Sequence, residues 1–317
     1  MPLRVLVLGS SGFLGSNLVA SLAESEDLSV VGASRNPSVP GEMRLDDYDE
    51  KSLDRILELV KPDFIINSVG MVGHLKVEEN PEISHHVNVS IPRRLGIIAR
   101  DREIRLVHFS SDSVYSGNPV EAPFYESSPP RPFSTYGRQK LESEQVLQEE
   151  NHDALILRIN FFGWSKSANL GMLDHFVSHA LAGTQPIGYA RYSVSSMATP
   201  TVSKILRKAL LQKLSGVYNL GSADGLSKYA FGQAVFSYLG LDPNRVIPSD
   251  PSIWEIEGVR ERDLRMSVSS IEEQLGISVR SQLEDLREAL TSLPIFLDYF
   301  GEKIEDSRRS LSGRLYQ

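Results

Sequence analysis

An apolar run near the N-terminus passes directly into a glycine-rich turn. The run Arg4–Leu8 is followed by Gly9, Gly12 and Gly15, which are spaced G-x-x-G-x-x-G and open a segment of helical spacing. Glycine is needed in such a turn where the backbone angles are unusual and where a ligand comes close to backbone N–H groups. Because a helix N-terminus carries partial positive charge, this strand-to-helix junction is typical of a site for a dinucleotide pyrophosphate.

Short runs rich in Val and Ile alternate with longer helical segments through residues 1–160, which is the pattern of βαβ units. Runs that are apolar on both faces suit a parallel sheet covered by helices on each side. The predicted strands are Arg4–Leu8, Ser29–Ala33, Asp63–Asn67, Arg105–Phe109 and Ala154–Arg158, and the predicted helices are Gly12–Ser25, Ser52–Val60, Pro81–Arg100 and Thr135–Glu150. We expect an α/β fold with a Rossmann-type, doubly wound parallel sheet.

The alternation becomes irregular beyond about residue 160. We expect residues 1–160 to form a dinucleotide-binding domain and residues 161–317 mainly a smaller substrate-binding lobe, with some segments returning to the sheet. The lobe is predicted to hold a loop-like stretch at Gly188–Pro200, helices at Thr201–Leu214 and Ser227–Leu239, and a short strand at Val217–Leu220.

Composition excludes several classes of function. The formal net charge is -8 and no basic run occurs, which argues against a nucleic-acid surface. The chain has no cysteine, so disulfides, thiolate metal sites and cysteine nucleophiles are excluded, and we expect no metal site. No apolar stretch is long enough to span a membrane and no export signal is recognised, so a cytoplasmic protein without a membrane partner is expected.

The end of the second predicted strand indicates which dinucleotide is preferred. Ser34 and Arg35 stand where a carboxylate would bind a ribose 2'-hydroxyl, and a guanidinium there matches a 2'-phosphate instead. NADP(H) is therefore favoured, while NAD(H) is not excluded. Asp46 and Asp47 are expected either near the adenine or at a helix cap.

Tyr136 and Lys140 are four residues apart on a predicted helix, so their side chains leave the same face. An ammonium group beside a phenol favours the phenolate and would lower its pKa, which suits acid–base catalysis near neutral pH. Ser111 follows the predicted strand Arg105–Phe109 and brings a hydroxyl to the end of the sheet where ligands bind in such folds.

With these features the chain resembles the extended short-chain dehydrogenase/reductase superfamily, and within it the dTDP-4-dehydrorhamnose reductase-like group of sugar-nucleotide reductases. The resemblance spans most of the chain. It rests on Gly9 to Gly15, on residues 61–67, on Val87-Asn88-Val89, on Ser110-Ser111-Asp112 with the later Gly117, on residues 136–140 and on Pro200-Thr201.

The resemblance implies a role for each matching residue. Tyr136 would donate a proton to the substrate carbonyl oxygen while the nicotinamide delivers hydride, Lys140 would hold the nicotinamide ribose, and Ser111 would hydrogen-bond the same oxygen. Asn88 would support a proton relay or, alternatively, a buried helix-to-loop contact. The implied cofactor-binding residues are Gly9, Ser11, Gly12, Phe13, Leu14, Gly15, Ser34, Arg35, Asp46, Ser68, Val69, Asn88, Tyr136 and Lys140. The implied substrate-binding residues are Lys76, Ser111, Tyr136, Asn160 and Arg260, with Tyr115 and Tyr125 as further candidates.

The chain departs from the group's pattern at two points. A Val-Asp-Lys-Ala-Glu signature is replaced by His74-Leu75-Lys76-Val77-Glu78, and an Arg-Pro element by Arg260-Glu261. Both changes fall where the sugar or its diphosphate is expected, so they bear on the identity of the substrate.

The leading interpretation is an NADPH-dependent reductase of a 4-keto nucleotide-sugar, for which a homodimer is compatible with the sequence. A dehydratase fits less well because Ser113 follows Asp112 where those relatives place a Glu. Two alternatives stay open. One is a nucleotide-sugar epimerase, and the other is a catalytically silent NADP-binding regulatory subunit similar to that of methionine adenosyltransferase.

Overall fold

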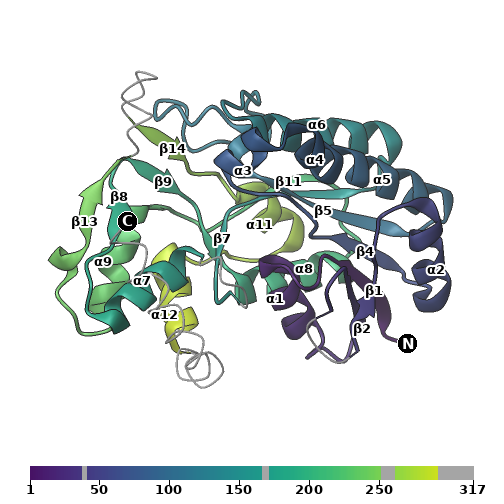
Figure 1. Ribbon diagram of the computed structural model, residues 1–317, viewed down its shortest axis with the longest axis horizontal. Helices are drawn as coiled ribbons and strands as arrows, with labels where there is room; N and C mark the ends of the chain where they lie inside the picture. Colours follow the sequence, from purple (N-terminus) through teal and green to yellow (C-terminus); the bar gives the residue numbers. More distant parts are fainter. Residues whose placement is uncertain (38–40, 166–170, 251–260, 292–317) are drawn as a thin grey trace.

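A parallel sheet of seven strands forms the centre of the computed structural model, which describes residues 1–37, 41–165, 171–250 and 261–291 (Figure 1). Its strand order is β11-β6-β5-β4-β1-β2-β3. The strands are β1 Leu3–Leu8, β2 Leu28–Ser34, β3 Met43–Arg44, β4 Phe64–Asn67, β5 Arg105–Ser111, β6 Leu155–Ile159 and β11 Gly216–Leu220. The chain runs outward from β1 in both directions, so the expected doubly wound α/β fold is confirmed.

Alternate residues of each central strand enter two separate cores, one on each side of the sheet. Val5 and Val7 pack toward one core, and Leu6 and Leu8 pack toward the other. The first core is covered by α1 Phe13–Leu22, α8 Thr199–Leu211 and α11 Ser269–Leu275, and the second by α2 Glu50–Val60, α5 Ile91–Asp101 and α6 Thr135–Glu150. Burial on both faces explains why these strands show continuous apolar runs instead of alternation.

The single helix predicted for Pro81–Arg100 is divided in the structure. It consists of α4 Pro81–His85, a π-helical turn over His86–Ser90 and α5. Pro92 has no N–H to donate to the carbonyl four residues earlier, and the N–H of Ile91 bonds to His86 O five residues back. The π turn carries Asn88 and turns its side chain into the protein.

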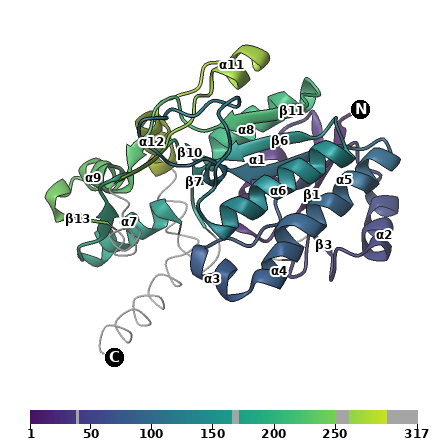
Figure 2. The ribbon, with the colours of Figure 1, turned by 90° about the horizontal axis from the view of Figure 1, so that it is seen from above.

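A smaller lobe packs beside the carboxyl ends of the strands, and Figure 2 shows α7 and α9 in it, apart from the α5–α6 layer. Its elements are β7 Phe161–Phe162, α7 Met172–Ala182, β8 Ile187–Tyr189, β9 Tyr192–Val194, β10 Met197–Ala198, β12 Leu226–Ser227, α9 Lys228–Tyr238, β13 Ile247–Ser249, β14 Arg262–Leu264 and α12 Gln282–Thr291. Buried aromatic rings, including those of Phe162, Phe176 and Phe231, form its core.

One sequence prediction for this half is wrong. The stretch Gly188–Pro200 is not a loop, because it contains β9, β10, most of β8 and the first two residues of α8. Strands of two or three residues are too short to leave a periodic signal. The strand predicted at Val217–Leu220 is present as β11, which pairs with β6 and is a segment of this half that returns to the main sheet. Helix α8 packs against α1. No helix in the described ranges has the length and apolar character that a membrane crossing requires.

Candidate functional site

The glycine turn after β1 leaves no room for a side chain at Gly15 and holds Gly9 at a positive φ. Gly9 has a φ of 81°, and a Cβ on Gly15 would lie 2.2 Å from Gly9 O and 2.6 Å from Ser68 Oγ. Gly12 is the N-cap of α1 and gives it no side-chain cap, so the first N–H groups of the helix face outward without such a partner. A negatively charged group can therefore approach this backbone closely, as the sequence predicts.

The residues expected around the dinucleotide lie at the ends of β1, β2 and β4. Ser68 Oγ donates to Leu8 O at 2.6 Å and Val69 N donates to Asn67 Oδ1 at 3.1 Å, which fixes the loop after β4 beside the turn. The Leu14 side chain is buried in the core, so only its backbone can face a ligand. Ser11 and Phe13 stay partly exposed at the turn.

Ser34 and Arg35 occupy the end of β2. The Ser34 hydroxyl is buried and has no hydrogen-bond partner among the described residues, while Arg35 is exposed. Asp46 is exposed and paired with Arg44 at 2.6 Å. The alternative that Asp46 or Asp47 caps the next helix is wrong, because Asp49 is the N-cap of α2 and accepts from Ser52 N at 2.7 Å. A place for Asp46 near the adenine stays a prediction.

The three candidate catalytic residues meet at the carboxyl end of β5. Ser111 ends β5, Tyr136 and Lys140 come from α6, and the Tyr136 and Ser111 hydroxyls are hydrogen-bonded. Burial raises the pKa of Tyr136, the Ser111 bond lowers it, and the charge of Asp112 raises it further. The prediction that Lys140 lowers this pKa is wrong for this structure. Burial disfavours the phenolate form of Tyr136 more than the hydrogen bond with Ser111 favours it.

Lys140 is directed at the backbone of β5. Its Nζ donates to Phe109 O at 2.8 Å, and only 4% of the residue is exposed. Burial lowers the pKa of Lys140 to about 8, against the opposing charge of Glu144. A Cβ on Gly70 would lie 3.7 Å from Lys140 Nζ and 3.8 Å from Asn88 Oδ1, so the two side chains border the same small space.

Asn88 joins the loop after β4 to α6. Its Oδ1 accepts from Met71 N at 2.8 Å, and its Nδ2 donates to Met71 O at 3.0 Å and to Gln139 Oε1 at 2.8 Å. This is the helix-to-loop contact that the sequence left open as an alternative to a proton relay.

Asp112 organises the polar side of the site. It is 2% exposed, and its Oδ1 accepts from Ser111 Oγ at 2.9 Å and from Ser113 Oγ at 3.3 Å. Its Oδ2 accepts from Asn160 Nδ2 at 2.7 Å, and Asn160 Oδ1 accepts from Ser196 Oγ. Burial raises the pKa of Asp112, and these hydrogen bonds oppose the rise. Asn160, predicted to bind substrate, has both amide atoms engaged by protein groups in this structure.

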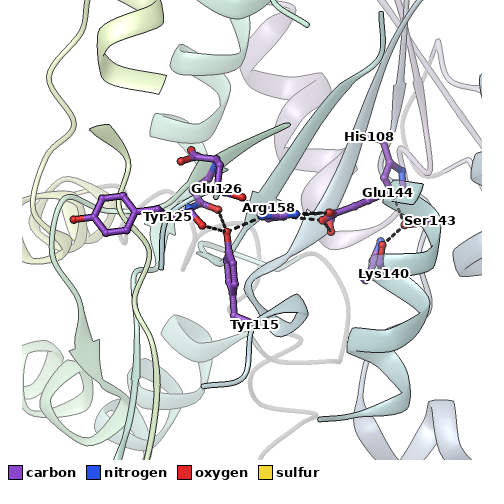
Figure 3. A network of polar contacts seen from close by, with 10 residues as sticks. His108, Tyr115, Tyr125, Glu126, Lys140, Ser143, Glu144 and Arg158 are labelled. Carbon is purple, nitrogen blue, oxygen red and sulfur yellow. Dashed lines mark hydrogen bonds and ion pairs between the residues drawn. The ribbon is translucent and has the colours of Figure 1, made fainter. Parts of the chain in front are cut away.

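A buried ion pair lies one helical turn beyond Lys140 on α6 (Figure 3). Arg158 Nη2 lies 2.7 Å from Glu144 Oε2, and the two side chains are 6% and 2% exposed. Arg158 also donates to Tyr115 OH at 2.8 Å, and Ser110 Oγ donates to Glu144 Oε1 at 2.5 Å. The network fastens α6 to β5 and β6. Tyr115 is fully buried in it, so its predicted role as a substrate contact is wrong.

His108 forms a second connection to α6, also visible in Figure 3. Its Nδ1 lies 3.1 Å from Asn67 Nδ2, and its Nε2 lies 3.1 Å from Ser143 Oγ, which donates to Lys140 O at 2.6 Å. Burial first, and the charge of Lys140 second, hold the pKa of His108 well below its usual value. The partners assign a neutral ring with the proton on Nε2.

Three further residues are predicted to bind substrate. Lys76 is exposed on α3 His74–Glu79, Tyr125 is 50% exposed, and Arg260 lies outside the described residues. Substrate binding by Lys76 and Arg260 therefore stays a prediction. A hollow of about 680 Å³ lies at the opposite, amino-terminal edge of the sheet, lined by Arg4, Lys61 and Asp63 among others, and does not include the catalytic candidates.

The lobe contributes three polar residues that sequence reasoning missed. Lys228 begins α9, and its Nζ lies 4.8 Å from the centre of the Tyr192 ring. Asp112 raises the pKa of Tyr192 and Arg262 lowers it, both after the larger raising effect of burial, so these groups are near one another. Arg262 is 6% exposed and its Cζ lies 3.4 Å from the centre of the Phe133 ring. No local pattern marked them, because they approach Asp112 only in the folded chain.

His175 and His179 on α7 are spaced four residues apart, a pattern that the sequence reasoning overlooked. Their ring centres are 4.8 Å apart. Within the described ranges, however, no three His, Asp or Glu side chains are grouped in a way that could hold a metal ion.

Comparisons with known proteins agree with the geometry. Residues 3–295 match the family model described as the RmlD substrate binding domain. The chain is 29% identical to the probable low-salt glycan biosynthesis reductase Agl14 of Haloferax volcanii, over 92% of this chain and 98% of that protein. It is 30% identical to the dTDP-4-keto-6-deoxy-D-glucose reductase of Streptomyces niveus, over 78% of this chain and 83% of the relative.

Among solved structures, dTDP-4-dehydrorhamnose reductase from Bacillus anthracis in complex with NADP shares the fold. Its TM-score is 0.79 at 20% identity, over 92% of this chain and 99% of that one. The likeness extends through both the sheet and the lobe. With the family model matched over nearly the whole described chain, the chain belongs to the RmlD substrate binding domain family, as its sequence motifs had indicated.

Proposed function

We propose that the protein is an NADPH-dependent reductase of a 4-keto nucleotide-sugar. The observation that carries the proposal is the hydrogen-bonded pair Ser111 and Tyr136 at the end of β5, with Lys140 one turn along the same helix. The names of the two sequence relatives, a glycan biosynthesis reductase and a 4-keto sugar-nucleotide reductase, support the same reaction class.

The residues present fit a dinucleotide. A bound dinucleotide could use three features of the site. These are the turn that admits no side chain at Gly15, the outward N–H groups of α1, and the Ser34 hydroxyl, which has no partner among the described residues. Arg35 is exposed where a 2'-phosphate would lie, which supports NADPH over NADH. When bound, the reduced nicotinamide would supply the hydride.

The protein groups would handle the proton. As negative charge develops on the substrate carbonyl oxygen, Tyr136 would transfer its phenolic proton to that oxygen, and Ser111 would hydrogen-bond the same atom. To do so, the Ser111 hydroxyl would turn its one proton from Asp112 Oδ1, which it contacts at 2.9 Å in this structure, to the substrate oxygen. A high pKa keeps Tyr136 protonated before the reaction, which suits a proton donor.

The test is turnover. Purified protein would be mixed with NADPH and a panel of 4-keto nucleotide-sugars, and absorbance of the reduced nicotinamide followed. We expect consumption with at least one member, and a loss of at least a hundredfold in Tyr136→Phe. Tyr238→Phe, at a tyrosine that ends α9 and is 46% exposed, is the matched control.

Two other outcomes would reject a reductase. Saturable NADPH binding with no turnover across the panel indicates a silent binding subunit. Interconversion of nucleotide-sugars without net consumption of NADPH indicates an epimerase.

A further inference from the structure

Lys228 carries a positive charge to the side of the site formed by the lobe. It is the first residue of α9, after the N-cap Ser227, and its Nζ lies 4.8 Å from the Tyr192 ring centre and 5.4 Å from that of Tyr189. Among the described residues, no carboxylate lies within ion-pair distance of this ammonium group. Two aromatic rings lie beside the charge, and no acceptor for its three N–H donors is found within the described ranges.

Lys228 and Asp112 lie close enough for the charge of each to shift the pKa of the other. The charge of Lys228 lowers the pKa of Asp112, and Asp112 raises that of Lys228 against the larger, lowering effect of burial. Among the described contacts no ion pair joins the two groups, and the Asp112 oxygens accept from Ser111, Ser113 and Asn160. The ammonium group of Lys228 therefore lies in the neighbourhood of Asp112, which orients Ser111, but it does not form an ion pair with that carboxylate among the described contacts.

The position of Lys228 works against the stability of its own helix. A cation at the first helical residue is opposed by the positive end of the helix dipole. Burial lowers the pKa of His175 on α7, a backbone hydrogen bond to Ile187 opposes this, and the charge of Lys228 lowers the pKa further. Lys228 is thus a partly buried cation in an unfavourable position, with no salt bridge among the described residues. Features of this kind, which lower stability without a structural benefit, are typical of functional sites.

We propose that Lys228 binds an oxyanion of the substrate, a phosphate or a carboxylate group, and so helps to decide which nucleotide-sugar is accepted. The inference rests on the proposed function, since it assumes that the sugar lies beside Ser111 and Tyr136. An ammonium group that lies beside two rings, with no salt bridge in the part of the chain that the structure describes, matches such a group, which Asp112 by itself would repel.

The test compares probes that differ by one anionic group. Binding to the NADPH-loaded protein would be measured by calorimetry for dTDP against thymidine, and for dTDP-glucuronate against dTDP-glucose. In Lys228→Met, the preference for one charged probe should fall at least tenfold, and the affected pair identifies phosphate or carboxylate as the group bound. Lys228→Arg should keep much of the preference.

Lys51→Met, at an exposed lysine on α2, is the control for a general loss of charge and should change neither preference by more than twofold. NADPH affinity should stay within twofold in all variants. Unchanged preferences in Lys228→Met would overturn the inference while leaving the reductase proposal intact. If the wild-type protein turns over no sugar yet Lys228→Met still loses the preference, the reductase proposal fails and the anion site stands.

A measurement on the wild-type protein covers the case in which Lys228→Met does not fold. Acetylation of Lys228 by acetic anhydride would be followed by peptide mass spectrometry, with and without dTDP and dTDP-glucuronate. We expect at least fivefold slower acetylation with one of the two, and no protection of Lys51. Equal rates at Lys228 with and without both probes would contradict the inference.

Discussion

Asn160 donates its side-chain amide to Asp112 Oδ2 across 2.7 Å, and the carboxylate so held accepts the Ser111 hydroxyl at 2.9 Å on its other oxygen. The link joins the end of β6 to the end of β5. Since a serine hydroxyl has one proton, Ser111 offers its lone pairs to other groups when it donates to Asp112. The orientation of a proposed catalytic hydroxyl is thus set by two residues that need not touch substrate.

Asp112→Asn should slow turnover without weakening the binding of the cofactor. The amide places N–H donors where Ser111, Ser113 or Asn160 now donate, so at least one bond is lost and Ser111 is misdirected. We expect kcat to fall about tenfold to a hundredfold, with NADPH affinity within twofold. Steady-state kinetics and NADPH fluorescence titration measure both, and the exposed Asp153→Asn is the control. Full turnover in Asp112→Asn would contradict this orienting role.

Lys140→Met should be more stable than the wild type at neutral pH although inactive. The folded pKa of Lys140 is about 8, against 10.5 for a free lysine. The unfolded chain holds this proton more tightly, so the charge destabilises the folded state below pH 8, and the penalty fades as pH rises from 8 to 10.5. We expect a gain of about 2 kcal/mol at pH 7, after allowing for the lost bond to Phe109 O.

Urea unfolding at pH 7 and pH 10 measures this gain. The difference between Lys140→Met and wild type should shrink at pH 10, whereas Lys51→Met should show no such dependence. A variant that is less stable than wild type at pH 7 would show that the charge of Lys140 is well compensated in the folded protein.

Arg158→Met should destabilise the protein strongly, because it leaves the Glu144 carboxylate buried without its partner. We expect a loss of about 3–5 kcal/mol in the free energy of unfolding. The double variant Arg158→Met/Glu144→Met should recover most of it, since no buried charge is left. Lys204→Met breaks the exposed pair with Glu288 and should cost far less. Equal losses in the two single variants, measured by urea unfolding, would rule out this explanation.

Arg35→Ser should change the choice of cofactor. An exposed guanidinium next to Ser34 at the end of β2 can pair with a 2'-phosphate, and the loss of a charge-assisted contact weakens NADPH binding about tenfold to a hundredfold. NADH binding should change little. Fluorescence titration with both cofactors decides the matter, and an equal effect on both would place Arg35 away from the 2'-phosphate. Arg55→Ser, on α2, serves as the control.

Gly15→Ala should abolish cofactor binding, because the added methyl would meet Gly9 O at 2.2 Å and force the turn open. Gly12→Ala should be milder, since its nearest neighbour would be 3.1 Å away and its φ of -74° is open to any residue. Circular dichroism confirms folding, and calorimetry with NADPH compares the two. Equal affinities in both variants would show that the tight approach at Gly15 does not shape the site.

The sequence by itself determined those features of the protein that depend on the spacing of residues close together in the chain. Apolar runs such as Val5 to Leu8 specify strands buried on both faces, the glycine triplet specifies the turn after β1, and the interval from Tyr136 to Lys140 specifies one helix face. Each signal lies within a window of a few residues, so it can be read before the chain folds.

Only the tertiary structure decided which distant groups meet. Asn160 and Lys228 approach Asp112 from β6 and α9, Arg158 pairs with Glu144, and β11 joins the main sheet beside β6. These pairings follow from packing two cores against one sheet, and no periodicity along the chain records them. Burial then sets the charge states, which is why Lys140 and Tyr136 have pKa values that the spacing of the two residues did not predict.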